Sequence, residues 1–217
     1  MIGPIDNDNQ FIEGFVLAGG ASSRMGQNKA HMCVGGKRLF ERAVAALSPI
    51  CHGPVAVVGR TSADLDFQTG LDVAPVPDLL EIRGTKLPQA PIVGLYTALT
   101  YGKMPWIAIL ACDLPFVTGD LMIKLAVYRS DEIDAIVPIQ PDANPQPLCA
   151  IYRRDKCLPV VKDMVEKGDL KMRRVVSSFN SHFVGFDKIA HLRDSANFFF
   201  NVNNPERHES ACKMAGD

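Results

Sequence analysis

A glycine-rich loop near the amino terminus has the composition of a phosphate-binding site. It spans residues 17–29 and reads LAGGASSRMGQNK, directly after a short apolar run. Its glycines let the backbone approach a ligand closely and expose amide N–H donors. Arg24 and Lys29 add fixed positive charge, and such groups are common partners of phosphate oxygens. The loop is therefore suited to a triphosphate.

The spacing of the glycines excludes two common phosphate-binding motifs. Gly19 and Gly20 are adjacent, whereas the dinucleotide fingerprint GxGxxG needs alternating glycines. A Walker A loop needs GK followed by Ser or Thr, but Gly26 is followed by Gln27. The alternative is a tight turn between a strand and a helix with solvated charges, and the whole string favours phosphate binding over it.

Two aspartates that directly follow expected strands are further candidates. Asp113 ends the most buried-looking apolar run, 106–112, and Asp78 follows Pro77. A carboxylate at the end of a buried strand is costly unless it is paired, hydrogen-bonded or bound to a cation. The alternatives are that Asp113 caps a helix starting near residue 119 or simply tops a turn before Pro115, and that Asp78 is a turn residue.

The composition is that of a globular protein without a general affinity for polyanions. The chain has 217 residues, 47% of them hydrophobic, which is enough for a sizeable core. Lys and Arg number 23 against 24 Asp and Glu, so the net charge of −1 predicts no general binding to nucleic acid or to an anionic membrane. No apolar stretch approaches the ~18 residues that cross a bilayer, and the first twelve residues lack the apolar region of a secretory signal. We expect a cytoplasmic protein.

The cysteines and histidines give little support to a disulfide scaffold or a zinc site. The six cysteines are scattered without a CxxC pair, which is typical of reduced thiols in a cytosol. The five histidines show no HExxH or other close ligand spacing. We interpret Cys112 as a small buried thiol and the basic residues within 171–174 as a solvated helix face.

Apolar segments alternate with longer segments of mixed polarity, and this order predicts an α/β fold. Strands are expected at residues 15–18, 54–58, 71–76, 106–111, 135–139 and 148–152, with a short one near Phe183. Helices are expected at residues 39–47, 92–99, 119–128, 156–166 and 170–177. Near-continuous apolar strands favour a mostly parallel sheet covered by helices on both faces.

The prediction is a single domain, 13–217, preceded by a flexible amino-terminal tail, 1–12. Ligands of such sheets bind beyond the carboxyl ends of the strands, where the glycine loop, Asp78 and Asp113 are expected. The segment 77–91 is rich in proline and charge, and it is the best candidate for a mobile lid.

Five motifs in order give the chain a specific family resemblance. The glycine loop resembles the signature of nucleotidyltransferases that activate cofactors, and most closely that of the molybdenum cofactor guanylyltransferases. Four further segments resemble motifs of that family: APIVGL (90–95) its GPLAGL, ACDLPF (111–116) its CDxP metal motif, PLCAIY (147–152) its PLxAxY and FNVNNPE (200–206) its NxNTPE. Together they cover most of the chain.

The resemblance implies a three-layer α/β/α sandwich of Rossmann-like topology and a specific reaction. The terminal phosphate of molybdopterin carrying molybdenum would attack the α-phosphorus of GTP, giving the guanine dinucleotide cofactor and pyrophosphate. Mg²⁺ on Asp113 is implied, because Mg²⁺ takes hard oxygen ligands and bridges to phosphates. The implied catalytic residues are Arg24, Lys29 and Asp113, and the implied nucleotide-binding residues are Leu17, Ala18, Gly19, Gly20, Lys29, Asp78 and Asp113.

The resemblance also favours GTP over CTP. Related transferases that use CTP read LAAG, whereas this chain has Gly19 at the third position, which leaves room for a purine. Asp78 corresponds by order to a family acidic residue that could accept hydrogen bonds from guanine or ribose. The chain departs from the family at Ala90 and Val93, which replace the first glycine and the alanine of GPLAG.

Asn201 and Asn203 are the expected contacts to the molybdenum cofactor. They alternate along a short extended segment, so both amides face one side and offer the donors and acceptors that a pterin edge requires. The alternative is that this segment is only a helix N-cap, with Glu206 in the first turn. Asn204 stands where the family has Thr.

Two other functions stay open at this point. One keeps the fold but uses CTP or a sugar phosphate, and the other is a non-catalytic relative that binds nucleotide or cofactor. Retention of Arg24, Lys29 and Asp113 argues against the second. The expected partners are GTP and molybdopterin as substrates, and proteins that supply or accept the cofactor in transient contacts, without nucleic acid or membrane.

Overall fold

The computed structural model describes residues 11–18, 32–59, 71–82 and 84–216 of the chain. The strands of its main sheet are β1 (Ile12–Leu17), β4 (Val55–Val58), β5 (Val73–Val76), β8 (Trp106–Ala111), β9 (Ala135–Pro138), β10 (Cys149–Arg153) and β11 (Ser181–Val184). The α-helices are α1 (Leu39–Leu47), α2 (Pro91–Tyr101), α3 (Gly119–Ala126), α4 (Arg154–Glu166), α5 (Met172–Ser177) and α6 (Pro205–Ala215). Two small hairpins pair β2 (Cys33–Val34) with β3 (Lys37–Arg38), and β6 (Glu81–Ile82) with β7 (Thr85–Lys86).

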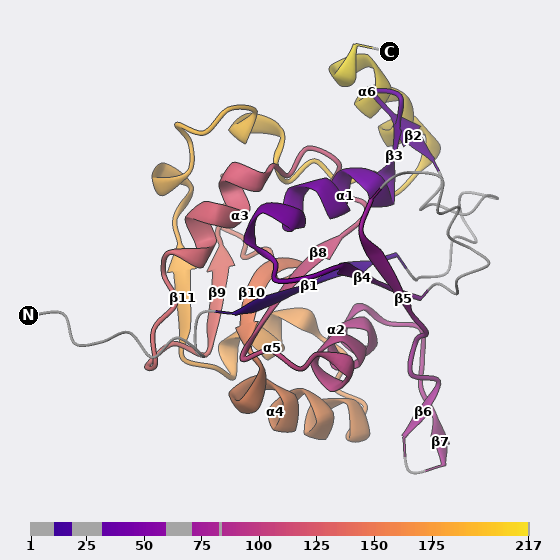
Figure 1. Cartoon of the computed structure of the whole chain (residues 1–217), viewed down its shortest axis with the longest axis vertical. Helices are drawn as coiled ribbons and strands as arrows, with labels where there is room; N and C mark the ends of the chain where they lie inside the picture. The colour runs from indigo at the N-terminus through magenta and orange to yellow at the C-terminus, as the bar shows by residue number, and fades with distance from the viewer. Residues whose placement is uncertain (1–10, 19–31, 60–70, 83, 217) are drawn as a thin grey trace, which may run out of the picture.

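The seven strands of the main sheet have the order β11-β9-β10-β8-β1-β4-β5 (Figure 1). β10 runs antiparallel to both of its neighbours, β8 and β9, whereas the other neighbouring pairs are parallel. The prediction of a mostly parallel α/β sheet is therefore confirmed. The antiparallel strand was not predicted; it follows β9 after a short connection that holds a bridge between Ile139 and Pro145.

Helices cover both faces of the sheet and complete a three-layer sandwich. One core packs α1 and α3 against one face and includes Ala211 of α6 at its edge, and a second core packs α2, α4 and α5 against the other face (Figure 1). In β8, Trp106, Ala108 and Leu110 belong to the first core, whereas Ile107 and Ile109 belong to the second. The strand is apolar throughout because both of its faces are buried.

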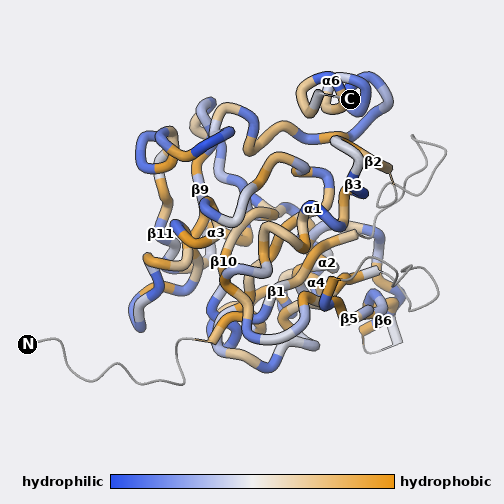
Figure 2. Tube along the Cα trace, turned by 45° about the horizontal axis from the view of Figure 1, so that its top comes forward, coloured by the Kyte–Doolittle hydropathy of each residue, from blue (hydrophilic) through white to orange (hydrophobic). Residues whose placement is uncertain are grey.

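The helix at the carboxyl terminus is the least buried of the α-helices in the described ranges. Of the described residues of α6, Ala211 alone is buried, and the helix is largely hydrophilic in Figure 2. It packs beside β2 at one end of the sandwich (Figure 1). No helix of the described ranges is long and apolar enough to cross a membrane.

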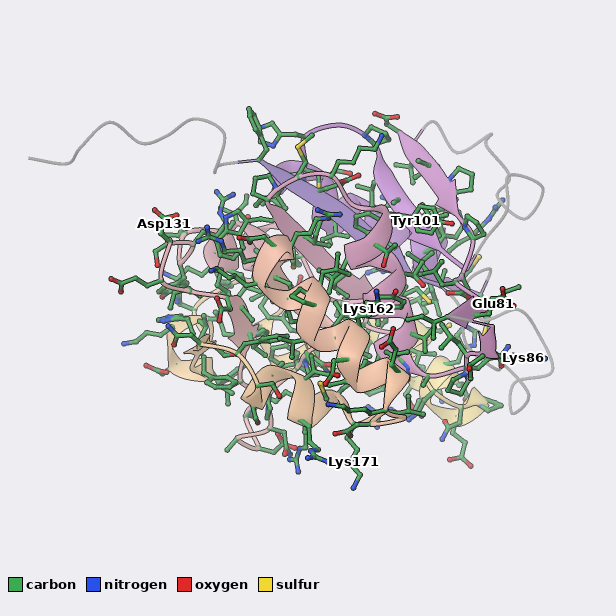
Figure 3. The ribbon with its side chains drawn as sticks, turned by 90° about the horizontal axis from the view of Figure 1, so that it is seen from below. Glu81, Lys86, Tyr101, Asp131, Lys162 and Lys171 are labelled. Carbon is green, nitrogen blue, oxygen red and sulfur yellow. The ribbon has the colours of Figure 1, made fainter. Side chains whose placement is uncertain are left out.

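The two largest differences from the expected elements lie near the amino terminus and in the segment 77–91. β1 begins at Ile12, the last residue of the expected tail, because this side chain is buried in the first core with 2% exposure. The segment expected to be a loop contains the β6–β7 hairpin, in which Glu81 is paired with Lys86 at the rim of the molecule (Figure 3). Two-residue strands are too short to give a hydrophobic period. Closure of this segment as a lid stays a prediction.

The basic residues that follow α4 lie on the surface, as expected. Lys171 points away from the body of the protein (Figure 3). Arg174 is 68% exposed and forms an ion pair of 2.9 Å with Asp169, while Arg173 donates a hydrogen bond to Asn144. Exposed pairs of this kind contribute little to stability.

Candidate active site

The carboxyl ends of four neighbouring strands lie in one row across the sheet. Leu17 of β1 is in register with Ala111 of β8 on one side and with Val58 of β4 on the other. Val58 is in turn in register with Val76 of β5. Because these strands are parallel, the segments that follow them emerge at the same edge, which is where ligands bind in such sheets.

Backbone hydrogen bonds also join the residues that directly follow β1 and β8 to the neighbouring strands. The amide of Ala18 donates to the carbonyl of Val58 at 3.1 Å, and the amide of Cys112 donates to the carbonyl of Leu17, also at 3.1 Å. Leu17 and Ala18 are 9% and 4% exposed. The residues that lead into the glycine loop are thus fixed directly beside the segment that carries Asp113.

Four of the predicted site residues lie outside the described ranges. They are Gly19, Gly20, Arg24 and Lys29. Their assignments to phosphate binding and catalysis stay predictions. The structure describes the first two residues of the loop, Leu17 and Ala18, and describes the chain again from Met32, just before β2.

Asp113 is partly buried two residues beyond the end of β8. The residue before it, Cys112, is 5% exposed, which confirms the prediction of a buried thiol. The N-cap residue of α3 is Thr118, so the alternative that Asp113 caps this helix is wrong. Asp113 lies in a turn at the sheet edge, which agrees with the alternative that it tops a turn before Pro115.

The segment with Asn201 and Asn203 lies against the loop of Asp113. The amide of Val202 donates a hydrogen bond of 2.8 Å to the carbonyl oxygen of Asp113. Val202 is fully buried, whereas Asn201 is partly buried and Asn203 is exposed. Residues about ninety positions apart in the sequence are thus brought to the same end of the sheet.

One amide oxygen in this segment is buried without a partner. Oδ1 of Asn201 is inaccessible to solvent and accepts no hydrogen bond from the described residues. An unpaired buried acceptor costs about 1–3 kcal/mol, and such groups in native proteins usually have a specific reason. An oxygen that a ligand completes is one such reason.

Asn204, rather than Asn201 or Asn203, caps α6. Its Oδ1 accepts a hydrogen bond of 2.8 Å from the amide of Arg207, and Pro205 occupies the first position of the helix. The capping interpretation of this segment is confirmed for Asn204. It leaves the side chains of Asn201 and Asn203 available for another role.

Asp78 is partly buried between β5 and the β6–β7 hairpin. The next residue, Leu79, donates its amide to Oγ1 of Thr97 at 3.2 Å, and this hydroxyl donates to the carbonyl of Val93 at 2.8 Å. Thr97 is fully buried in α2. The helix thereby holds the segment of Asp78 at the sheet edge, through a residue that the motif analysis missed because a single Thr in an apolar helix gives no signal.

The glycine of the APIVGL motif is explained by close packing at the end of β1. A Cβ on Gly94 would lie 3.3 Å and 3.4 Å from the two Cδ atoms of Leu17. Leu17 is the first residue of the glycine loop, so α2 packs against the start of that loop. A larger side chain at position 94 would overlap with the side chain of Leu17.

Two arginines that the sequence analysis also missed bind the backbone of these segments. Arg42 of α1 donates Nε to the carbonyl of Pro115 at 2.8 Å, two residues after Asp113. Arg207 of α6 donates Nε to the carbonyl of Asn201 at 2.5 Å. Single arginines on the polar faces of helices have no distinguishing pattern in one sequence.

The described residues provide oxygen donors but no dense cluster of metal ligands. No group of three or more His, Cys, Asp or Glu side chains in these ranges could hold a metal ion. Mg²⁺ sites in phosphoryl-transfer enzymes often use one or two carboxylates together with substrate phosphates, and the Asp113 carboxylate fits that chemistry.

The cysteines form no disulfide bonds, and burial opposes ionisation of the Cys149 thiol. All six cysteines are free thiols, as expected. Burial raises the pKa of Cys149 to about 12, so this thiol is protonated near neutral pH.

Comparison with known proteins agrees with the motifs. Residues 14–183 match the family model of the MobA-like NTP transferase domain. A protein of Geobacillus sp. (strain WCH70), named "Probable molybdenum cofactor guanylyltransferase", is 30% identical over 198 residues, which cover 91% of this chain and 96% of that protein. A protein of the same name from Natranaerobius thermophilus is 28% identical over 211 residues, covering 94% and 97%.

Solved structures share the fold. Molybdopterin-guanine dinucleotide biosynthesis protein A from Archaeoglobus fulgidus has a TM-score of 0.73 and 23% identity, covering 94% of this chain and 98% of that one. The 2-C-methyl-D-erythritol 4-phosphate cytidylyltransferase of Thermus thermophilus has a TM-score of 0.64 and 16% identity, covering 95% and 100%. With its motifs, its sheet and its family match in agreement, the chain belongs to the MobA-like NTP transferase domain family.

Proposed function

We propose that this protein transfers GMP from GTP to the terminal phosphate of molybdopterin carrying molybdenum, releasing pyrophosphate. One observation carries the proposal: the hydrogen bond from Val202 to Asp113, which joins the predicted cofactor segment to the predicted metal-binding loop. An enzyme that links two substrates must bring their sites together. The names of the full-length relatives support the same reaction.

The nucleotide is assigned to the sheet edge beside β1. The glycine loop starts at Leu17, whose carbonyl oxygen accepts the amide of Cys112, so amides of Gly19 and Gly20 would bind phosphate oxygens beside the Asp113 segment. Arg24 and Lys29 would neutralise charge on the β- and γ-phosphates. Asp78 follows β5 at the same edge and would contact guanine or ribose.

The chemistry is positioning and neutralisation of charge rather than covalent catalysis. An oxygen of the acceptor phosphate forms a bond to the α-phosphorus, while the bond from that phosphorus to the oxygen bridging to the β-phosphate breaks. Asp113 would hold Mg²⁺, which when bound neutralises charge on the phosphates. Arg24 and Lys29 would stabilise the negative charge that develops on the leaving pyrophosphate.

The acceptor is assigned to the segment of Asn201 and Asn203. The unpartnered Oδ1 of Asn201 is an acceptor that a pterin N–H could complete, and Asn203 offers an exposed amide. We further propose that residues 13–217 act as one domain in the cytoplasm, in transient contact with proteins that supply or accept the cofactor.

Pyrophosphate release tests the proposal directly. The purified protein is assayed with molybdopterin carrying molybdenum and with GTP, CTP, ATP or dTTP, each with and without Mg²⁺. We expect release that depends on GTP, Mg²⁺ and the acceptor together. Release with CTP, or with a sugar phosphate as acceptor, would replace the proposed substrates, and nucleotide binding without any release would indicate a non-catalytic relative.

Replacement of the carboxylate provides the matched comparison. Asp113→Asn removes one charge with almost no change in volume and should lower pyrophosphate release by at least about a hundredfold. Asp187→Asn is the control, because Asp187 is 71% exposed and forms an ion pair with the neighbouring Lys188. A similar loss in both variants would mean that Asp113 has no special role.

A further inference from the structure

Four side chains from distant parts of the sequence form a continuous stack beside the proposed site. In spatial order they are Arg42 of α1, Phe116, Phe200 and Arg207 of α6. The Arg42 guanidinium carbon lies 5.7 Å from the centroid of the Phe116 ring, and the Arg207 carbon lies 4.1 Å from that of Phe200. The two rings meet edge to face, with centroids 6.0 Å apart and an interplanar angle of 74°. Both contact types are attractive at these distances.

The acceptor end of the stack holds the backbone around Asn201. Arg207 donates Nε to the carbonyl of Asn201, and its own amide is bound by the capping oxygen of Asn204. Phe200, the ring under its guanidinium, directly precedes Asn201. One residue therefore fixes both ends of the four-residue segment that carries the predicted cofactor ligands.

The other end of the stack binds the backbone of segments beside the proposed nucleotide site. Arg42 donates Nε to the carbonyl of Pro115 and Nη1 to the carbonyl of Val34, at 2.8 Å and 2.9 Å. Val34 lies in β2, the first described strand after the glycine loop. Phe116, which follows Pro115, carries the stack from this loop to the acceptor segment.

The cost of burying the Asn201 amide oxygen without a partner indicates why such support is needed. The buried Oδ1 of Asn201 has no partner among the described residues, and it would gain a hydrogen bond by moving toward water. A group held at such a cost persists because its surroundings fix it. In this structure the fixing contacts are the hydrogen bond from Arg207 and the one between Val202 and Asp113.

We propose that the stack is a positioning device that keeps the acceptor segment in register with Asp113, with Arg207 as its principal positioning residue. The expected effect on the KM for molybdopterin carrying molybdenum rests on the proposed function. Its structural consequence, order in the segment 200–204, does not depend on which substrates are used.

The test compares Arg207→Gln with the wild type and with a matched control. Lys213→Gln is the control, because it also removes one positive charge from α6 and its ion-pair partner is the exposed Glu209. Arg207→Gln should raise the KM for molybdopterin carrying molybdenum roughly tenfold, since a charged hydrogen bond contributes at least about that factor. The KM for GTP should stay within about twofold, and Lys213→Gln should change neither constant.

A second readout is independent of activity. Hydrogen exchange at the amide of Val202 reports the bond to Asp113, and Arg207→Gln should accelerate it roughly tenfold or more while distant core amides keep their protection. Arg207→Lys keeps the charge but lacks the guanidinium that donates and stacks at once, so it should fall between wild type and Gln. Should Arg207→Gln fail to fold, Phe200→Leu removes the ring beneath Arg207 and should also accelerate this exchange.

The possible results distinguish failure of the positioning role from failure of the proposed function. Unchanged Val202 exchange in both Arg207→Gln and Phe200→Leu would overturn the positioning role. Accelerated exchange with an unchanged KM for the cofactor would likewise overturn it, because the order would then serve stability alone. If the wild type itself releases no pyrophosphate with any nucleotide, the proposed function fails, and the exchange comparison still decides whether the stack orders the segment.

Discussion

Replacing Asn204 with alanine separates the capping role of its segment from the proposed ligand role of its neighbours. Oδ1 of Asn204 accepts the amide of Arg207 at 2.8 Å, and this amide is one of the orphan donors at the start of α6. Loss of such a cap costs about 1 kcal/mol of unfolding free energy. In a chain of this length that corresponds to a Tm lower by roughly 2–4 °C.

Asn203 is the matched comparison, because the same change one residue earlier removes an exposed amide outside the cap. We expect Asn203→Ala to leave the unfolding free energy within about 0.5 kcal/mol of the wild type, as for other surface substitutions. We also expect it to raise the KM for the molybdenum cofactor. Asn204→Thr should recover most of the lost stability, since Thr is also a favoured N-cap residue.

Thermal unfolding and initial-rate kinetics measure the two effects separately. Scanning calorimetry of the wild type and the three variants at neutral pH gives the Tm values, and pyrophosphate release at varied cofactor concentration gives the KM. Equal destabilisation in Asn203→Ala and Asn204→Ala would refute the assignment of the cap. A normal KM in Asn203→Ala would refute its ligand role while leaving the cap intact.

Three further predictions concern buried positions of the sandwich, each measured by urea unfolding. Thr97→Val should lower the unfolding free energy by about 1–3 kcal/mol, because it leaves the amide of Leu79 without its acceptor; an unchanged value would mean that water replaces the hydroxyl. Gly102→Ala should lower the unfolding free energy by about 1–3 kcal/mol, because the added Cβ would lie 2.9 Å from the carbonyl oxygen of Ala98. An unchanged unfolding free energy would show that the turn after α2 shifts freely. Burial raises the pKa of Cys149 from 9.0 to about 12. The folded protein therefore holds this proton to a higher pH than the unfolded chain does, which stabilises the fold below pH 9. That stabilisation is lost as the pH rises from about 9 towards 12. The unfolding free energy of Cys149→Ala should therefore fall less steeply above pH 9 than that of the wild type. An identical dependence on pH in the two proteins would contradict the raised pKa.

The central elements could be predicted because their patterns are unambiguous. α1 and β8 have the predicted bounds, the first from its helical spacing and the second from six consecutive apolar residues. The ends of β1 were less predictable, because Glu13 and Gly14 interrupt its apolar run. Glu13 is explained only in three dimensions, where its carboxylate accepts the amide of Lys103 at the start of a loop.

Strand direction and short hairpins could not be predicted with the same success. β10 is apolar like a parallel strand, because it too is buried on both faces, so its composition does not reveal that it is antiparallel. The turn residues between β9 and β10, at 140–147, were the available signal. The β6–β7 hairpin has two residues on each side and offers no period to detect.

The residues of the candidate site stay predictions, and their arrangement could not be predicted from the sequence. Motif order alone could not show that Val202 donates to the carbonyl of Asp113, because nothing local links two segments so far apart in the chain. The same limit applies to Arg42 and Arg207, whose roles depend on which carbonyls lie opposite them. Long-range contacts of this kind are specified by packing of the whole sandwich rather than by any one motif.

The position of Asp113 explains how one sheet edge could serve two substrates. Its side chain is the proposed ligand of the metal at the nucleotide site, while its carbonyl oxygen is engaged by the acceptor segment. A displacement of that segment would therefore act on the same residue that is proposed to hold the metal. Because the Val202 contact uses backbone atoms, replacing either side chain leaves its donor and acceptor atoms in place. The accuracy with which the two substrates meet then depends on the surrounding side chains, which is where the Arg42–Arg207 stack lies.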